Sequence, residues 1–296
     1  MNTAIIHLSD LHLTELKNAE GEYIYESWFL DKNNRFEEET LDFIKNKKEK
    51  LNIDNFILVV SGDLSNTSSQ EEYDVLASFL EKLIAKTNIH KNNVLIVPGN
   101  HDINWAENMK AYEESKNTSL KKKTAHEFYE EKYKYFSKFY NDFYSNDIKF
   151  PSQKYVIRDF SYDNSILFVC LNSTLEMSYV KEQENQRRVI FDLSKLEKEL
   201  EELSKQYDKK YSQLIKIAIL HHNPIKMSTD PTSKCIHNWD NISNIFKKYD
   251  IKIFLFGHEH VANMKREDDF LYISVGGLGN KNWGENSISF LRFDLY

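Results

Sequence analysis

Short apolar runs recur along the whole chain and are separated by polar stretches. Several of the runs are apolar at consecutive positions, so both faces of the strand they predict would be covered. This pattern is typical of strands in the interior of a sheet. The runs are AIIHL near 4–8, FILVVS near 56–61, NVLIV near 93–97, SILFVCL near 165–171, LIKIAIL near 214–220, IKIFLF near 251–256, FLYISV near 270–275 and SISFLRF near 287–293.

A different periodicity fills some of the segments between these runs. Apolar side chains recur at helical spacing from Val75 to Ile84 and from Leu193 to Leu203. Strand and helix patterns therefore alternate, which predicts an α/β fold. Neither an internal repeat nor a linker rich in Pro, Gly or Ser is visible, so we expect residues 1–296 to form a single domain.

The segment 105–150 interrupts the alternation, because it is rich in Lys, Glu, Tyr and Phe. Its aromatic residues from Phe128 to Phe143 recur at a spacing that predicts a helix with one aromatic face. That face either packs on the body of the domain, or forms a cap over the functional site or a contact between two copies of the chain. We therefore expect a helical insertion or cap near 105–150, which is also the candidate surface for a homodimer.

Polar side chains directly follow five of the apolar runs. In α/β sheets, ligands bind at the carboxyl ends of the strands, so these side chains are expected to converge. They offer carboxylate, amide and imidazole groups and no thiolate, which suits Mn²⁺, Fe or Zn²⁺ and disfavours a cysteine-type zinc or iron–sulfur site. The clusters are Ser9-Asp10-Leu11-His12, Ser61-Gly62-Asp63, Pro98-Gly99-Asn100-His101-Asp102, His221-His222-Asn223-Pro224 and Gly257-His258-Glu259-His260.

Each cluster alone has an ordinary structural interpretation. Asp10 could cap a helix, Gly62-Asp63 could be a plain turn, and His258 and His260 could be a surface pair. The cluster GNHD is more specific, because its glycine lets the backbone turn sharply and present three functional side chains together. Five such clusters, each at the end of a predicted strand, favour a functional site over separate structural needs.

Charge and cysteine content narrow the range of functions. The formal net charge is −7, which argues against a general nucleic-acid coat protein, since such proteins neutralise phosphates with Lys and Arg. The two cysteines, Cys170 and Cys235, cannot form a disulfide framework, which favours a reducing cytoplasm. The beginning of the chain shows no secretory signal, and no apolar run is long enough to span a membrane.

The five clusters together resemble the signature of the calcineurin-like metallophosphoesterase superfamily. That signature reads D-x-H, G-D, G-N-H-[DE], a later His and G-H-x-H, and this chain matches it as SDLHL, SGDLSN, PGNHD, LHHNP and FGHEH. The resemblance runs from Ile5 to about Gly277. It implies a four-layer α/β/β/α sandwich with two mixed β-sheets flanked by helices. The segment from Val59 to Leu83 looks most like the branch of class III cyclic-nucleotide phosphodiesterases, although Asn223 replaces a proline of that branch.

The resemblance also implies a dinuclear metal centre and a role for each residue. Asp10, His12 and His260 would hold one cation, and Asn100, His221 and His258 the other. Asp63 would bridge the two cations. His101 would face the substrate, bind a phosphoryl oxygen and protonate the leaving alkoxide, while Asp102 would orient His101 or tie down the loop. His222 would lie behind the ligands, with the alternative that it exchanges roles with His221.

The implied reaction is hydrolysis of a phosphoester by hydroxide that two divalent metal ions generate. Mn²⁺ is the expected metal, with Fe or Zn²⁺ as alternatives. The resemblance to the phosphodiesterase branch favours a small phosphodiester, such as a cyclic nucleotide, as the substrate. The alternatives are a nuclease of a repair or defence system, a phosphomonoesterase or phosphoprotein phosphatase, and a metal-free binding scaffold on the same fold. The acidic chain makes nucleic acid the less favoured partner.

Overall fold

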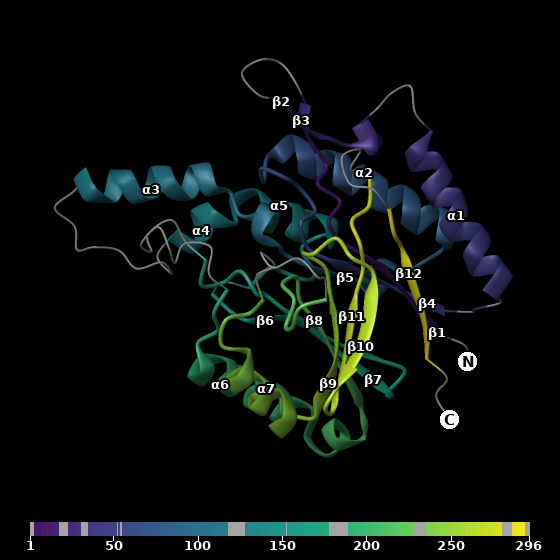
Figure 1. The fold of residues 1–296 in the computed structure, drawn as a ribbon, viewed down its shortest axis with the longest axis vertical. Coiled ribbons are helices and arrows are strands. Elements are labelled where there is room, and N and C mark those ends of the chain that lie inside the picture. The colour runs from purple at the N-terminus through teal and green to yellow at the C-terminus, as the bar shows by residue number, and fades with distance from the viewer. Residues whose placement is uncertain are drawn as a thin grey trace.

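Two mixed β-sheets flanked by helices form the body of the protein (Figure 1). The computed structural model describes residues 3–17, 23–30, 35–51, 53, 55–117, 128–151, 153–177, 189–227, 235–279 and 286–293. This arrangement confirms the α/β class and the two flanked sheets that the sequence resemblance implied. The division of the chain into one domain with an insertion stays a prediction.

The first sheet has four strands in the order β12-β1-β4-β5. Strands β1 (Thr3–Leu8), β4 (Asn55–Ser61) and β5 (Val94–Val97) run parallel to one another, and β12 (Ser289–Phe293) pairs with β1 in the antiparallel direction. Every residue of β1 and β5 is buried, as their uninterrupted apolar sequences predict. Because β1, β4 and β5 are parallel, their carboxyl ends reach the same edge of the sheet.

The second sheet has six strands in the order β10-β11-β9-β8-β7-β6. Its parallel strands are β7 (Ile166–Leu171), β8 (Ile215–Ile219), β9 (Ile251–Phe256) and β11 (Phe270–Ser274). The edge strands β6 (Val156–Tyr162) and β10 (Asn263–Glu267) are antiparallel to their neighbours. A separate hairpin pairs β2 (Glu15–Lys17) with β3 (Tyr23–Glu26).

Helices lie on the outer sides of the two sheets (Figure 1). Helices α1 (Phe36–Leu51) and α2 (Gln70–Thr87) pack together on the side of the first sheet, and α6 (Leu193–Tyr207) and α7 (Trp239–Lys248) lie on the side of the second. Helix α2 begins after Ser69, whose side chain forms a capping box with Glu72. Short 3₁₀ helices cover Trp28–Leu30, Lys91–Asn93, Asn100–Asp102 and Asp208–Gln213.

The aromatic stripe of the segment 105–150 is part of the hydrophobic core. The predicted single helix consists of two helices, α4 (Tyr129–Lys132) and α5 (Lys134–Phe143), which are separated at Tyr133. Phe136 and Tyr140 are fully buried, so the stripe packs on the body of the protein. Helix α3 (Trp105–Asn117) precedes them, and residues 118–127 lie outside the described part of the chain. A dimer contact through this segment stays a prediction.

Lys132 connects this helical segment to the loop that follows β7. Its side chain is buried, and its ammonium group donates hydrogen bonds to the carbonyl oxygens of Thr174 at 2.7 Å and Leu175 at 2.8 Å. A third bond goes to the carbonyl oxygen of Met177 at 2.5 Å. One cation thus satisfies three buried backbone acceptors of a single loop, which fixes the loop's path beside the carboxyl end of the sheet.

We expect Lys132→Met to lower the free energy of unfolding by about 2–4 kcal/mol, because buried carbonyl oxygens would lose their donor. Urea denaturation followed by circular dichroism measures the effect. Lys134→Met is the matched control, since that side chain is half exposed and its ammonium group contacts Glu107 and the ring of Tyr135 at the surface. The control should stay within about 0.5 kcal/mol of the original protein. Equal stability of the two variants would show that Lys132 does not hold the loop.

Candidate metal centre

The polar clusters meet where the carboxyl ends of five parallel strands converge. Loops after β1, β4 and β5 supply residues from the first sheet, and loops after β8 and β9 supply residues from the second. Most of the side chains that the sequence predicted as ligands lie close together in the structure, in groups that share members. The four groups, each with ligand atoms within 4.8 Å of one another, are Asp10 with His12 and His260, Asp10 with Asp63 and His221, His12 with Asp63 and His101, and His221 with His222 and His258.

Asp63 occupies the middle of this cluster. Its Oδ2 atom lies 3.1 Å from Nε2 of His221 and 3.6 Å from Nε2 of His12. These two imidazoles are the ones assigned to different cations by the sequence resemblance. The side-chain oxygen Oδ1 of Asn100 lies beside these groups, 3.2 Å from Nε2 of His221. The position of Asp63 between the two imidazoles is the geometry that a bridging carboxylate requires.

Asp10 organises the opposite side of the cluster. Its Oδ1 atom lies 3.3 Å from Nε2 of His260 and 4.0 Å from Nε2 of His12. Its Oδ2 atom accepts a hydrogen bond of 3.0 Å from the backbone N–H of His258. Asp10 therefore ties the loop after β1 to the loop after β9, so that the two sheets are joined at the cluster itself.

Several residues of the cluster have a strained backbone conformation. Five of them have positive φ values, which are uncommon for side chains larger than glycine. Such conformations cost on the order of 1–3 kcal/mol each and persist where surrounding contacts impose them, often at functional sites. The residues are Asp10 at 54°, His12 at 40°, Asp63 at 50°, His258 at 73° and His260 at 54°. The loops thus give up local stability to point these side chains inward.

Two glycines of the signature let the loops approach the carboxylates closely. A Cβ atom on Gly257 would overlap with Oγ of Ser9 and Oδ2 of Asp10. A Cβ atom on Gly99 would overlap with Oδ1 and the backbone nitrogen of Asp63. Both positions therefore require glycine because of contact with the ligand-type side chains.

Hydrogen bonds on the far side of the imidazole rings fix their orientation. Nδ1 of His12 lies 3.2 Å from Oδ1 of Asn66, and Nδ1 of His221 lies 2.9 Å from the carbonyl oxygen of Ser61. Because these oxygens accept, each ring carries a proton on Nδ1 and turns its Nε2 atom toward the carboxylates. No role was predicted for Asn66 from the sequence. The only indication of one was its place in SGDLSN, three residues after Asp63.

His101 sits at the border of the cluster. Its backbone N–H donates to Oδ1 of Asp63 at 2.7 Å, and its Nδ1 atom lies 2.9 Å from the carbonyl oxygen of Asn66. Its ring centroid is 4.6 Å from that of His12. The side chain is partly exposed, whereas His12 is buried. With Nδ1 donating to Asn66, Nε2 is the atom that His101 can present to another group.

Asp102 lies behind the cluster and joins the loops after β4 and β5. Its carboxylate accepts hydrogen bonds from the backbone N–H groups of Leu64, Ser65 and Gly99. The hydroxyl groups of Ser65 and Tyr73 also donate to Oδ1, at 3.0 Å and 3.1 Å. These contacts hold the chain around Asp63 and Asn100 in place. Of the two roles expected for Asp102, orienting His101 or tying down the loop, they support the second.

His222 packs against His221 and His258 and is buried. Its Nδ1 atom lies 2.9 Å from Oγ of Ser173, in the loop after β7, and its ring centroid lies 4.6 Å from that of His258. Asp63 has its short contact with His221 rather than with His222. The alternative in which the two histidines exchange roles therefore has less geometric support.

The electrostatics of the cluster favour a cation. Burial would raise the pKa of Asp63, but the adjacent His221 outweighs it and holds that pKa well below its usual range. Burial would lower the pKa of His221, yet Asp63 raises it to about 9. For Asp10, His260 outweighs burial and lowers the pKa to about 2. Burial lowers the pKa of His12 to about 3. The site therefore combines two ionised carboxylates with neutral imidazole, and one buried proton on His221 balances part of their charge.

This donor set fits divalent metal ions of the Mn, Fe and Zn type. Carboxylate oxygen and imidazole nitrogen are their ordinary ligands, and the imidazole protons point outward to fixed acceptors. Deprotonating His221 would supply a further imidazole lone pair directed at Asp63. The residues of the cluster can thus hold such ions without rearrangement of the loops.

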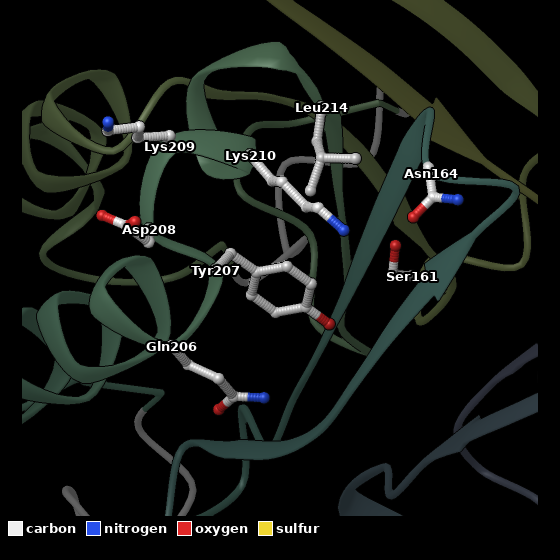
Figure 2. Close-up of a pocket in the computed structure, with 8 residues that line it drawn as sticks. All are labelled: Ser161, Asn164, Gln206, Tyr207, Asp208, Lys209, Lys210 and Leu214. Carbon is white, nitrogen blue, oxygen red and sulfur yellow. The ribbon is translucent and has the colours of Figure 1, made fainter.

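A cavity of about 570 Å³ lies elsewhere, at the opposite end of the six-stranded sheet (Figure 2). The turn between β6 and β7 and the end of α6 form its walls. Figure 2 shows Tyr207 and Lys210 directed toward Ser161, with Lys209 directed away. None of the residues of the cluster lines this cavity, so the cavity and the candidate metal centre are separate sites.

Comparisons with known proteins agree with the geometry. The model of the family described as calcineurin-like phosphoesterase matches residues 3–262. A metallophosphoesterase-like protein of Bacillus subtilis (strain 168), YydB, which is described as uncharacterized, is 27% identical over 254 residues. The alignment covers 80% of this chain and 48% of YydB, so the chain spans about half the length of that relative.

Solved structures that match this chain have little sequence in common with it. The purple acid phosphatase PPD1 from yellow lupin (Lupinus luteus) seeds matches with a TM-score of 0.51 and 15% identity, covering 99% of this chain and 49% of that one. A dimetal phosphatase from Danio rerio matches with a TM-score of 0.49 and 14% identity, covering 93% and 87%. In the described part of the chain, no helix has the length and apolar character needed to cross a membrane.

Proposed function

Because the chain belongs to the calcineurin-like phosphoesterase family, we propose that it hydrolyses a small phosphodiester at a dinuclear metal centre. The observation that supports this proposal most strongly is the position of Asp63 between His12 and His221. One carboxylate that faces two imidazoles from different sheets can serve two cations at once. Divalent cations supply Lewis acidity there, which lowers the pKa of water and offsets charge on a phosphoryl oxygen.

The proposed ligands divide into two sets that share Asp63. The first set is Asp10, His12 and His260, and the second is Asn100, His221 and His258. The contacts of Asp10 with His12 and His260, and of His221 with Asn100, support this division. Mn²⁺ is the metal we propose, with Fe and Zn²⁺ as the other ions that suit mixed carboxylate and imidazole ligands.

His101 is the residue that we propose as the general acid. Its backbone N–H is anchored on Asp63 and its Nδ1 on Asn66, so the partly exposed Nε2 keeps a fixed position at the border of the cluster. When protonated, Nε2 would donate its proton to the alkoxide that leaves phosphorus. Asp102 positions the loops without contributing to proton transfer, since its carboxylate is engaged by Leu64, Ser65 and Gly99.

A diester is the proposed substrate because SGDLSN and LHHNP resemble the class III cyclic-nucleotide phosphodiesterase branch. A small molecule is favoured over nucleic acid by the net charge of −7, since a nucleic-acid surface gains affinity from Lys and Arg. We also propose a reducing, cytoplasmic location, which agrees with the two free cysteines, Cys170 and Cys235.

Activity assays with added Mn²⁺ test the proposed function. We expect bis-p-nitrophenyl phosphate to be hydrolysed faster than p-nitrophenyl phosphate, and a panel of cyclic mono- and dinucleotides would then narrow the substrate. Removal of metal by a chelator should abolish the reaction, and Mn²⁺ should restore it. Faster turnover of the monoester would assign a phosphatase, and cleavage of plasmid or single-stranded DNA at comparable rates would assign a nuclease.

A further inference from the structure

We propose that Glu259 and Asn223 form a positioning pair that holds His258 and His260 in their ligand geometry. The inference rests on the proposed metal centre, because these two histidines matter only as its ligands. Glu259 lies between them in the loop after β9, and Asn223 lies in the loop after β8, two residues beyond His221. The pair therefore connects the two loops that the second sheet contributes to the cluster.

The Glu259 carboxylate contacts both ends of a short strap, residues 223–227. Its Oε1 atom accepts a hydrogen bond of 2.7 Å from Nδ2 of Asn223, and its Oε2 atom accepts one of 3.1 Å from the backbone N–H of Met227. The strap is fixed further by Nδ2 of Asn263, which donates to the carbonyl oxygen of Met227 at 3.1 Å. Bonds to an ionised carboxylate are shorter and stronger than bonds between neutral groups.

The amide orientation of Asn223 follows from its neighbours. Its Nδ2 atom also donates to the carbonyl oxygen of Ile225 at 3.0 Å and to Sγ of Cys235 at 3.2 Å. Glu259 and Ile225 both present acceptors, so the NH₂ group must face them. Its backbone carbonyl accepts from the N–H of Ile236 at 3.1 Å, and the residue is fully buried. Asn223 is thus a fixed donor rather than a mobile surface amide.

Backbone strain explains why the loop after β9 needs this anchor. His258 and His260 both have positive φ values, and Glu259 is the residue between them. Strained conformations persist only when neighbouring contacts determine them. The backbone N–H of His258 is held by Asp10, and the side chain of Glu259 adds two bonds at the centre of the strained segment. Without them, the loop could relax and turn the imidazoles away.

Asn223 is also the position at which this chain departs from the phosphodiesterase signature. A proline there would provide a rigid backbone but no side-chain donor for Glu259. In this chain the amide donor and the carboxylate acceptor occur together, one in LHHNP and one in FGHEH. The departure at Asn223 makes physical sense beside Glu259, because the amide gives the partly buried carboxylate a hydrogen-bond donor.

Calorimetric titration of chelator-treated protein with Mn²⁺ tests the pair by metal affinity, independently of turnover. We expect Glu259→Ala to weaken Mn²⁺ binding at least about tenfold, the range found when residues behind metal ligands are lost. Asn223→Asp should have a similar effect, because the new carboxylate and that of Glu259 would repel each other. The double variant Asn223→Asp with Glu259→Gln reverses donor and acceptor, and it should recover most of the lost affinity.

Glu267→Ala is the control, since that exposed carboxylate on β10 forms only a surface ion pair with Lys265. It should bind Mn²⁺ as the original protein does. If the double variant binds no better than Asn223→Asp, or if Glu259→Ala matches the control, the positioning role is overturned. Failure of the original protein itself to bind Mn²⁺ would overturn the proposed metal centre instead, so the two proposals fail in different ways.

Discussion

Asp63→Asn is expected to abolish phosphoesterase activity and to remove most of the bound metal in the same step. Asparagine keeps the shape of the side chain but loses the negative charge that faces His12 and His221. Two cations close together need that shared charge, and their Lewis acidity contributes several kcal/mol to the rate. The expected loss is therefore at least about 10³-fold in kcat/KM. Elemental analysis and hydrolysis of bis-p-nitrophenyl phosphate measure the two effects.

Asp268→Asn is the matched control, because it makes the same substitution at a residue with the same backbone conformation. Asp268 has a φ of 51°, close to the 50° of Asp63, but it lies in the exposed turn between β10 and β11. Asparagine tolerates this conformation, so the control should keep its metal and its rate. If Asp63→Asn kept the turnover rate and the metal content of the unchanged protein, the Asp63 carboxylate would not be a bridge between two cations.

His101→Ala is expected to lower kcat by about 10²–10⁴-fold while leaving the metal content near normal. This separation follows from the position of His101 at the border of the cluster, where its Nδ1 atom is anchored on Asn66 and its side chain is partly exposed. The effect should be smaller for substrates that release p-nitrophenolate than for substrates that release an alkoxide, because a good leaving group needs less protonation. Rates with both types of substrate and metal analysis check the prediction.

His90→Ala is the control for this variant, since His90 is exposed at the start of the 3₁₀ helix Lys91–Asn93. It should leave the rate and the metal content unchanged. His101 also belongs to a group with His12 and Asp63 in which all ligand atoms are close together. Loss of metal from His101→Ala would therefore make His101 a ligand and end its assignment as the general acid.

The buried strands could be predicted from sequence, but β6 and β10, the edge strands of the second sheet, could not. Uninterrupted apolar runs identified β1, β4, β5 and β9, since a strand covered on both sides has no room for a polar face. Strand β10 reads NMKRE and is exposed at every residue, so its sequence carries no burial signal. Strand β6 was missed for a different reason: Arg158 and Asp159 interrupt its apolar residues, although Arg158 is buried.

The aromatic segment shows a limit of periodicity. The spacing from Phe128 to Phe143 predicted one helix, and the buried aromatic face is confirmed by the core. The break at Tyr133 could not be predicted, because it depends on tertiary contacts. Its hydroxyl group lies 2.6 Å from Oγ1 of Thr174, and the neighbouring Lys132 reaches the same loop. Long-range bonds of this kind leave no pattern in the local sequence.

The candidate ligands were predictable because their chemistry is local. Asp10, Asp63 and His221 could be identified because each carries a carboxylate or imidazole group just after a predicted strand. The residues that orient them were not visible, since Asn66 and Glu259 act through contacts between loops far apart in the chain. The two roles expected for Asp102 could not be separated from the sequence, because only the structure shows that its carboxylate accepts from backbone N–H groups of the loop after β4.

The most direct test of the metal centre is an anomalous-difference map from crystals grown with Mn²⁺ and measured on both sides of the manganese absorption edge. Two peaks are predicted, both in contact with the Asp63 carboxylate, one beside His12 and the other beside His221. A single peak that touches only one of these imidazoles, or no peak at Asp63 at saturating Mn²⁺, would contradict the dinuclear centre on which the proposed function depends.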